Sequence, residues 1–244
     1  MARSKIEWLK NPDGSQGYSI NPVKGLCPMD CKDLEGKPYC YARKLYRRFK
    51  WNPEIRFDET VLTQALYKTK VGDKIFVGST MELFGDWIKF DWLLRIIEYT
   101  MMYPSRTFIF LTKQPQNLPI KFPPNCWVLV SATDQHQYLT GLCYLRQIEA
   151  TVRGFSFEPL LHKINTSYDT LDWNILGSQT QPVKHPPLEW VNLILQYARE
   201  FETPVFVKSP MAEYFGINRK EFPVSTGLRG NCERTDKMRN ENGH

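Results

Sequence analysis

The chain has 244 residues, of which 42% are hydrophobic and 24% are charged, so it can bury a core as one large domain or two small ones. This composition excludes a disordered chain, a collagen-like chain and a coiled coil. No apolar run reaches the roughly 18 residues of a membrane span, and residues 1–10 lack the apolar stretch of a secretory signal. We therefore expect a cytoplasmic protein with no membrane contact.

Short apolar runs rich in β-branched and aromatic residues alternate with helical patterns along the chain. Runs that are apolar on both faces are typical of strands in a buried parallel sheet. The expected strands are 17–22, 74–79, 107–112, 127–131, 154–158, 173–177 and 204–208.

Between these strands lie segments whose apolar residues recur at helical spacing. Residues 90–102 and 189–201 each place their apolar side chains in one stripe. Weaker patterns predict further helices over 41–49, 59–67 and 140–150.

Strand and helix alternate about seven times, which indicates the α/β class. With this length we expect a partial (β/α) TIM-like barrel of about six to seven parallel strands, forming a single domain over residues 1–226. Residues 227–244 carry many charges and few apolar side chains, and they predict a flexible C-terminal tail.

Basic charge is concentrated in one segment. The whole chain has a formal net charge of +6, and residues 41–50 alone hold five Lys and Arg with no acid. Such an excess is typical of a patch that meets phosphates or an acidic partner, although a solvated helix face has the same pattern.

Three cysteines, Cys27, Cys31 and Cys40, lie within 14 residues. Clustered thiolates suit iron–sulfur clusters or zinc. A structural zinc takes four ligands, and the first histidine, His136, is far along the chain. Three ligands with an open position favour a reactive cluster. Buried thiols serving as small hydrophobes are the alternative, which the polar residues of 32–37 disfavour.

Polar residues follow six of the expected strands. In β/α folds the ligand site lies at the carboxyl ends of the strands, so we expect these side chains to form a ligand-facing rim. The candidates are Ser79, Thr80, Glu82, Lys113, Ser131, Asp134, Glu158, Gln179 and Lys208.

The cysteine loop resembles the cluster-binding loop of the radical S-adenosylmethionine (SAM) superfamily, whose usual pattern is C-x3-C-x2-C. Cys27 and Cys31 match the first spacing. Cys40 departs from the second, because eight residues separate it from Cys31 where two are usual. Residues 33–39 look like an insertion, and lengthening a surface loop costs little free energy.

The whole chain resembles a phage- and prokaryote-associated branch of that superfamily whose function is unknown. One departure is Gln179, where the branch more often has an acid. The matching stretches run in order over 6–8, 21–25, 40–43, 76–84, 110–113, 127–135, 155–161, 172–177 and 204–208.

This resemblance implies a [4Fe–4S] cluster held by Cys27, Cys31 and Cys40, with SAM bound at the free iron. The reduced cluster would cleave SAM to a 5′-deoxyadenosyl radical that abstracts hydrogen from a substrate. The cofactor would perform the bond cleavage, and the protein would orient the cofactor. The implied electron donor is a flavodoxin or ferredoxin.

The resemblance also implies roles for individual residues. Ser79, Thr80 and Glu82 would lie near the SAM amino group, and Lys113 near its carboxylate. Ser131 and Asp134 would contact the ribose, and Tyr41 would pack near the adenine. Those facing substrate would be Glu158, Gln179 and Lys208.

The basic segment supports a second hypothesis, a nucleic-acid-binding protein whose cysteines hold a structural zinc. Aromatic residues are interleaved with its cations, a pattern suited to phosphates and stacked bases. The two hypotheses merge if the substrate of a radical enzyme is a nucleotide or nucleic acid. The segment would equally suit an acidic reductase such as flavodoxin.

Overall fold

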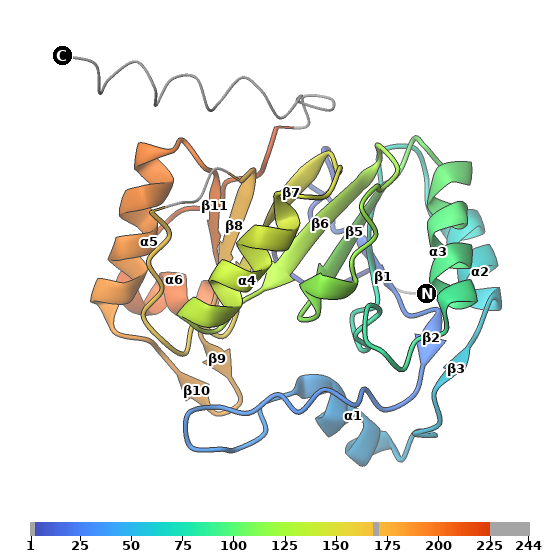
Figure 1. Ribbon diagram of the computed structural model, residues 1–244, viewed down its shortest axis with the longest axis horizontal. Coiled ribbons are helices and arrows are strands. Elements are labelled where there is room, and N and C mark those ends of the chain that lie inside the picture. The colour runs from blue at the N-terminus through green and yellow to red at the C-terminus, as the bar shows by residue number, and fades with distance from the viewer. Residues whose placement is uncertain (1–2, 168–170, 225–244) are drawn as a thin grey trace.

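Seven parallel strands form a sheet that curls into a half-barrel, in the order β1-β4-β5-β6-β7-β8-β11 (Figure 1). The computed structural model describes residues 3–167 and 171–224, and the tail expected over 227–244 lies outside them. Each strand overlaps one that the apolar runs predict, which confirms the partial β/α barrel. The strands are β1 (Tyr18–Ile20), β4 (Lys74–Val77), β5 (Thr107–Thr112), β6 (Cys126–Ser131), β7 (Val152–Phe157), β8 (Trp173–Leu176) and β11 (Val205–Val207).

Helices α2 to α6 pack on the convex side of the sheet, whereas α1 lies beyond its carboxyl edge (Figure 1). None of the helices in the described part of the chain is long and apolar enough to cross a membrane. The helices are α1 (Tyr41–Phe49), α2 (Thr60–Lys68), α3 (Phe90–Met102), the 3-10 turn η1 (Pro115–Asn117), α4 (Gln135–Leu145), α5 (Leu188–Glu200) and α6 (Ser209–Phe215).

Several short elements have no counterpart in the sequence prediction. Two-residue strands are too short to show alternation, and α6 spans only 7 residues. The unexpected strands pair antiparallel, β2 (Val23–Lys24) with β3 (Arg56–Phe57) and β9 (Gln179–Thr180) with β10 (Val183–Lys184).

Helix α4 corrects the predicted helix over 140–150. It begins five residues earlier, at Gln135, and ends at Leu145. The Asp134 carboxylate accepts a hydrogen bond of 2.8 Å from the Gln137 backbone N–H, which caps the first turn. The prediction from apolar spacing started this helix too late because it did not take the Asp134 cap into account.

The two faces of the sheet belong to two apolar clusters, because alternate side chains of a strand point to opposite faces. The convex face packs against the helices. On the concave face, the N-terminal segment inserts Trp8 edge-on against Phe76 and Trp173, at ring distances of 5.2 and 5.9 Å. From the C-terminal side, Phe222 packs on Trp173 and Phe206. These aromatic rings fill the open side of the half-barrel.

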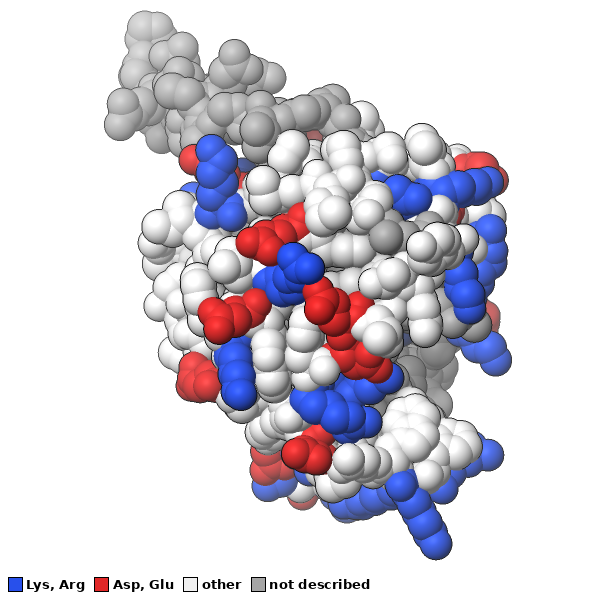
Figure 2. Space-filling model, turned by 90° about the vertical axis from the view of Figure 1, so that its right-hand side faces the viewer, with Lys and Arg blue, Asp and Glu red and all other residues white. Residues whose placement is uncertain are grey.

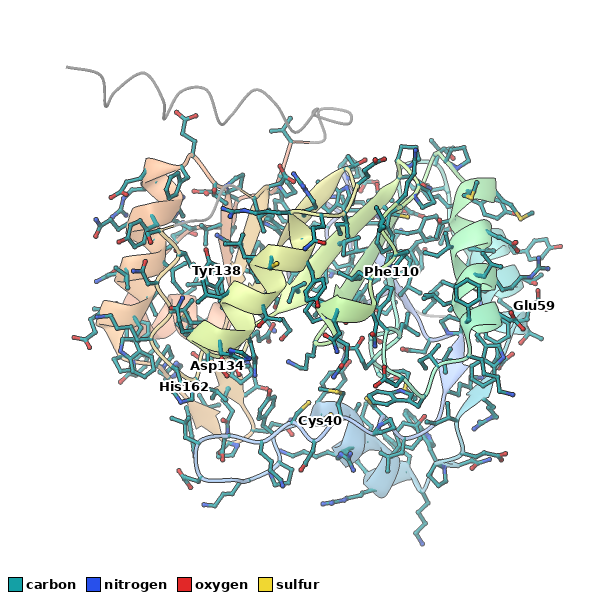
Figure 3. All side chains as sticks on the ribbon, viewed as in Figure 1. Cys40, Glu59, Phe110, Asp134, Tyr138 and His162 are labelled. Atoms are coloured by element: carbon teal, nitrogen blue, oxygen red, sulfur yellow. The ribbon has the colours of Figure 1, made fainter. Side chains whose placement is uncertain are left out.

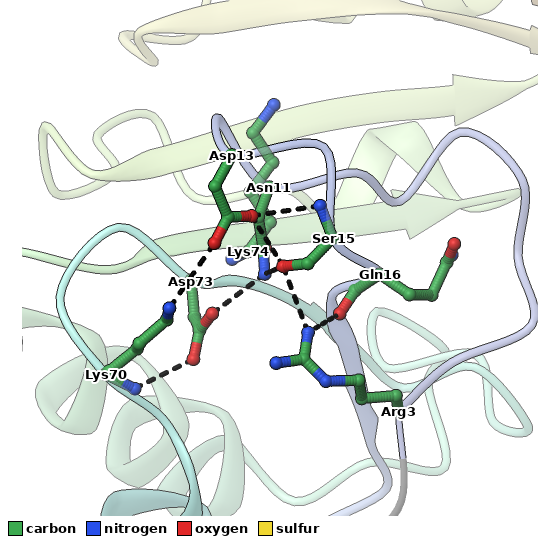
Figure 4. A network of polar contacts seen from close by, with 8 residues as sticks. All are labelled: Arg3, Asn11, Asp13, Ser15, Gln16, Lys70, Asp73 and Lys74. Carbon is green, nitrogen blue, oxygen red and sulfur yellow. Dashed lines mark hydrogen bonds and ion pairs between the residues drawn. The ribbon is translucent and has the colours of Figure 1, made fainter.

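A polar network holds the N-terminal segment in place (Figure 4). The Asn11 side chain donates to Asp73 Oδ1 and accepts from the Lys74 backbone N–H, both at 2.8 Å. Asp73 also accepts from the Lys70 backbone N–H at 2.8 Å. Because Asn11 and Asp73 are buried, losing either partner would leave a polar group unsatisfied. The network therefore fixes where Trp8 enters the half-barrel.

Replacing Gly154 with Ala tests the close approach of β7 and β8. A Cβ atom at this position would lie 2.1 Å from the carbonyl oxygen of Trp173 on β8. We expect Gly154→Ala to lose about 1–3 kcal/mol of unfolding free energy and to lower the Tm by about 3–10 °C. Thr63→Ala, at an exposed position of α2, is the control. An unchanged Tm for Gly154→Ala in a thermal melt would contradict the tight strand pairing.

Candidate functional site

A cavity of about 380 Å³ lies between the carboxyl ends of the strands and the cysteine loop. Ile6 and Trp8 of the N-terminal segment line it together with strand residues. Most of the side chains expected at the strand ends and in the cysteine loop lie together around it. The candidates that line this one cavity are Cys27, Cys31, Cys40, Tyr41, Ser79, Thr80, Glu82, Lys113, Ser131, Glu158, Gln179 and Lys208.

Asp134 is the candidate that the structure places elsewhere. It does not line the cavity, and its carboxylate is occupied in capping α4. In Figure 3 Asp134 lies at the start of α4, while Cys40 lies at the start of α1, beyond the carboxyl edge of the sheet. A capping role and a ligand-binding role leave the same sequence signal, because both place an acid directly after a strand.

The three cysteines share one wall of the cavity. The thiols of Cys31 and Cys40 are hydrogen-bonded to each other, which raises the pKa of Cys31 and lowers the pKa of Cys40. Burial raises the pKa of Cys27. The Arg43 guanidinium donates to the carbonyl oxygens of Cys27 and Met29, at 3.0 and 3.1 Å. Helix α1 thus holds the loop that carries two of the thiols and supplies the third directly before its first turn.

The side chains at this wall that could bind a metal or cluster are three free cysteines. Among the described residues, no three His, Cys, Asp or Glu side chains are placed to hold a single metal ion. Thiolates are the protein ligands of iron–sulfur clusters, and three free thiols that line one cavity have the donor chemistry of such a site.

The segment between Cys31 and Cys40 forms a tight turn that is bound to the β9–β10 hairpin. The Asp33 carboxylate accepts from the backbone N–H groups of Glu35 and Lys37, at 3.0 and 2.9 Å. It also accepts from Lys184 Nζ at 3.0 Å and from Gln179 Nε2 at 3.3 Å. The bond from Lys184 holds the pKa of Asp33 far below its usual range. An acid at position 179 would repel the Asp33 carboxylate, whereas the glutamine donates to it.

A buried carboxylate and an ammonium group lie on the wall formed by β4 and β5. Glu82 accepts from Thr112 Oγ1 and from the Lys113 backbone N–H, both at 2.7 Å, and from the Phe84 backbone N–H at 3.0 Å. Burial raises the pKa of Glu82. The Lys113 ammonium group donates to Ser131 Oγ at 2.6 Å. A carboxylate offers about four acceptor sites, so Glu82 retains capacity for one further donor.

Asn21, which follows β1, organises the turn after β4. Its amide donates to Ser79 Oγ at 3.1 Å and accepts from the Thr80 backbone N–H at 2.9 Å. The Tyr41 hydroxyl donates to the Ser79 carbonyl oxygen. Strand-end position predicted Ser79 and Thr80, but the supporting role of Asn21 depends on the pairing of β1 with β4.

The opposite wall carries the residues proposed to face substrate. Lys208 and Glu158 form an ion pair, and Gln179 Oε1 is buried with no hydrogen-bond partner among the described residues. Ser178, which directly follows β8 beside Gln179, also lines the cavity, and its Oγ lies 2.8 Å from His185 Nδ1.

Alkylation of the metal-free protein tests the Cys31–Cys40 pair. Because the Cys31 thiol stabilises the Cys40 thiolate, Cys40 should react with iodoacetamide at nearly constant rate from about pH 9 down to about pH 6. Removing the donor in Cys31→Ala should raise the pKa of Cys40 and slow its labelling at about pH 6 by about tenfold. Peptide mass spectrometry measures the rate at each cysteine.

The exposed Cys143 provides the matched control for this alkylation, since Cys143→Ala should leave the labelling of Cys40 unchanged. Equal rates for Cys40 at low pH in the wild type and in Cys31→Ala would contradict the hydrogen-bonded pair.

Comparison with known proteins gives one match. No curated protein and no solved structure matches the chain. The sequence model of a family described as "Protein of unknown function (DUF5131)" matches residues 3–231. This range includes the half-barrel, the cysteine loop and every residue that lines the cavity. The chain therefore belongs to the DUF5131 family.

Proposed function

We propose that the protein is a radical SAM enzyme whose cavity holds a [4Fe–4S] cluster and SAM. The observation that carries the proposal is that three free thiols line one cavity together with the buried carboxyl group of Glu82 and the ammonium group of Lys113. The resemblance of the cysteine loop to the cluster-binding loop of that superfamily supports it. A half-barrel with its cavity at the carboxyl ends of the strands is a suitable scaffold for it.

Cys27, Cys31 and Cys40 would hold the cluster. A reduced cluster of this kind supplies one electron to SAM, which splits into methionine and a 5′-deoxyadenosyl radical, and the radical takes a hydrogen atom from the substrate to form 5′-deoxyadenosine. The chain's own part is to bind, orient and exclude water. Trp8 and Ile6 on the apolar side of the cavity would keep water from the reacting atoms.

The SAM molecule would meet groups that match its charges. The Lys113 ammonium group would bind the methionine carboxylate, and Glu82 would accept from the amino group with its remaining lone pair. Ser131 would contact the ribose. The ring of Tyr41, directly after the last cysteine, would pack near the adenine.

Substrate would lie against the opposite wall. The unpaired Gln179 Oε1 is a ready acceptor for a substrate N–H or O–H, because a buried acceptor without a partner costs free energy. The Glu158–Lys208 pair would orient polar groups beside it. A reducing cytoplasm, with flavodoxin or ferredoxin as electron donor, suits free cysteines.

Metal analysis of anaerobically purified protein tests the cluster. We expect about four irons per chain and an electron paramagnetic resonance spectrum of the reduced protein that changes on adding SAM. Changing any of the three site cysteines to Ser should abolish most of the iron. Cys126→Ser is the matched control, since Cys126 is buried in β6 away from the cavity.

Stoichiometric zinc without iron, unchanged after reconstitution, would contradict the radical enzyme and support a structural zinc site. A full iron content with no cleavage of SAM under reducing conditions would contradict the assigned reaction but not the cluster.

Lys113→Met tests the assigned SAM contact. The methionine side chain keeps the length of lysine but loses the charge, and a charged hydrogen bond is worth about 1.5–3 kcal/mol. We expect the Kd for SAM to rise by about 10- to 100-fold while the iron content stays at the wild-type level. Lys121→Met, at an exposed position, should leave both unchanged. Wild-type SAM affinity in Lys113→Met would contradict the assignment.

A further inference from the structure

Aromatic and basic side chains gather at the C-terminal end of α1. We name Arg47, Arg48, Phe49, Lys50 and Trp51 the α1 surface. All five are exposed, and the large rings of Phe49 and Trp51 have 52% and 46% of their surface in solvent. In Figure 2 Lys and Arg side chains protrude at the lower end of the molecule, where Figure 1 places α1.

The other face of α1 is committed to the fold. Arg43 binds the cysteine loop, Lys44 Nζ donates to the Gln181 carbonyl oxygen at 3.0 Å, and the Tyr46 hydroxyl accepts from the Gly25 backbone N–H at 2.8 Å. Within the described residues no hydrogen bond or ion pair engages the side chains of Arg47, Arg48 or Lys50. The cations of the α1 surface are therefore available to a partner.

The rings of the α1 surface are already arranged for stacking. Lys50 adopts a left-handed conformation, with φ of 50°, which turns the chain so that the Trp51 ring lies nearly parallel to the Phe49 ring at 5.5 Å. Tyr46 packs edge-on against Trp51 at 5.2 Å, and the Arg48 guanidinium lies 5.3 Å from the centre of the Phe49 ring.

We propose that the α1 surface binds single-stranded nucleic acid, with bases stacked on Phe49 and Trp51 and phosphates bound by Arg47, Arg48 and Lys50. Exposed aromatic faces beside cations are the combination that binds single strands. Residues 41–53 contain no acid that would repel phosphates. An acidic protein would pair with the cations but would leave the exposed rings without matching groups.

The position of α1 connects this surface to the cavity. The helix starts directly after Cys40, its first residue Tyr41 lines the cavity, and its 9 residues span about 14 Å at about 1.5 Å per residue. A strand bound at the far end is therefore close to the cavity. Assigning nucleic acid as the substrate class rests on the proposed function, whereas binding at the α1 surface does not.

Fluorescence anisotropy with anaerobically purified full-length protein tests the proposal. The probe is a fluorescein-labelled oligothymidylate of about 12 nucleotides, within the usual site size, and a duplex of the same length is compared. Contacts to three phosphates predict a slope of about −2 for the logarithm of the binding constant against the logarithm of salt concentration. Trp51→Ala should weaken binding by about tenfold or more, and Trp51→Phe should retain most of it.

Arg47→Ala combined with Arg48→Ala should weaken binding and reduce the salt slope. Lys68→Ala combined with Lys163→Ala removes the same charge at exposed positions elsewhere and should leave both unchanged. Iron content and thermal melting of each variant report on the cluster and on folding, so loss of the cluster is distinguishable from loss of binding.

Three results would overturn the proposal. They are no binding of the oligonucleotide at low salt, equal affinity for duplex and single strand, and wild-type affinity in Trp51→Ala. Capture of an acidic flavodoxin by the α1 surface, without binding of the oligonucleotide, would overturn it in favour of an electron-donor interface.

Discussion

The packing of Trp8 against Trp173 and Phe76 inside the half-barrel is the interaction on which the rest of the structure depends. A sheet that does not close leaves its concave face without a partner, and large aromatic rings supply the apolar area that it needs. The buried Asn11–Asp73 contact fixes the entry of the N-terminal segment. Because Trp8 also lines the cavity, the element that completes the core forms part of the site as well.

Helix α1 connects the chemistry of the cavity to the surface of the molecule. It supplies Cys40 before its first turn, holds the cysteine loop through Arg43, and ends in the exposed rings and cations around Trp51. The nucleic acid that we propose for this surface would therefore be held by the same rigid element that positions Cys40. Sites built on helices and strands are held more precisely than sites built on loops.

The long spacing between Cys31 and Cys40 is compensated by contacts from a distant part of the chain. The turn around Asp33 is internally hydrogen-bonded and tied to Lys184 and Gln179 on the β9–β10 hairpin. The residues between Cys31 and Cys40 therefore do not leave Cys40 loosely placed. Gln179 suits this contact, since it donates to the Asp33 carboxylate, which an acid at position 179 would repel.

The seven strands and most of the cavity lining can be read from the amino-acid sequence alone. Strands buried on both faces leave continuous apolar runs, and residues directly after parallel strands converge at one edge of the sheet. Which polar side chains keep hydrogen-bonding capacity for a ligand depends on contacts formed in the folded chain. Asp134 caps a helix, Arg43 holds the cysteine loop, and Asn21 joins the site through Ser79, a neighbour distant in sequence. A sequence pattern gives the type and spacing of a side chain, but its hydrogen-bond partners depend on how the chain folds.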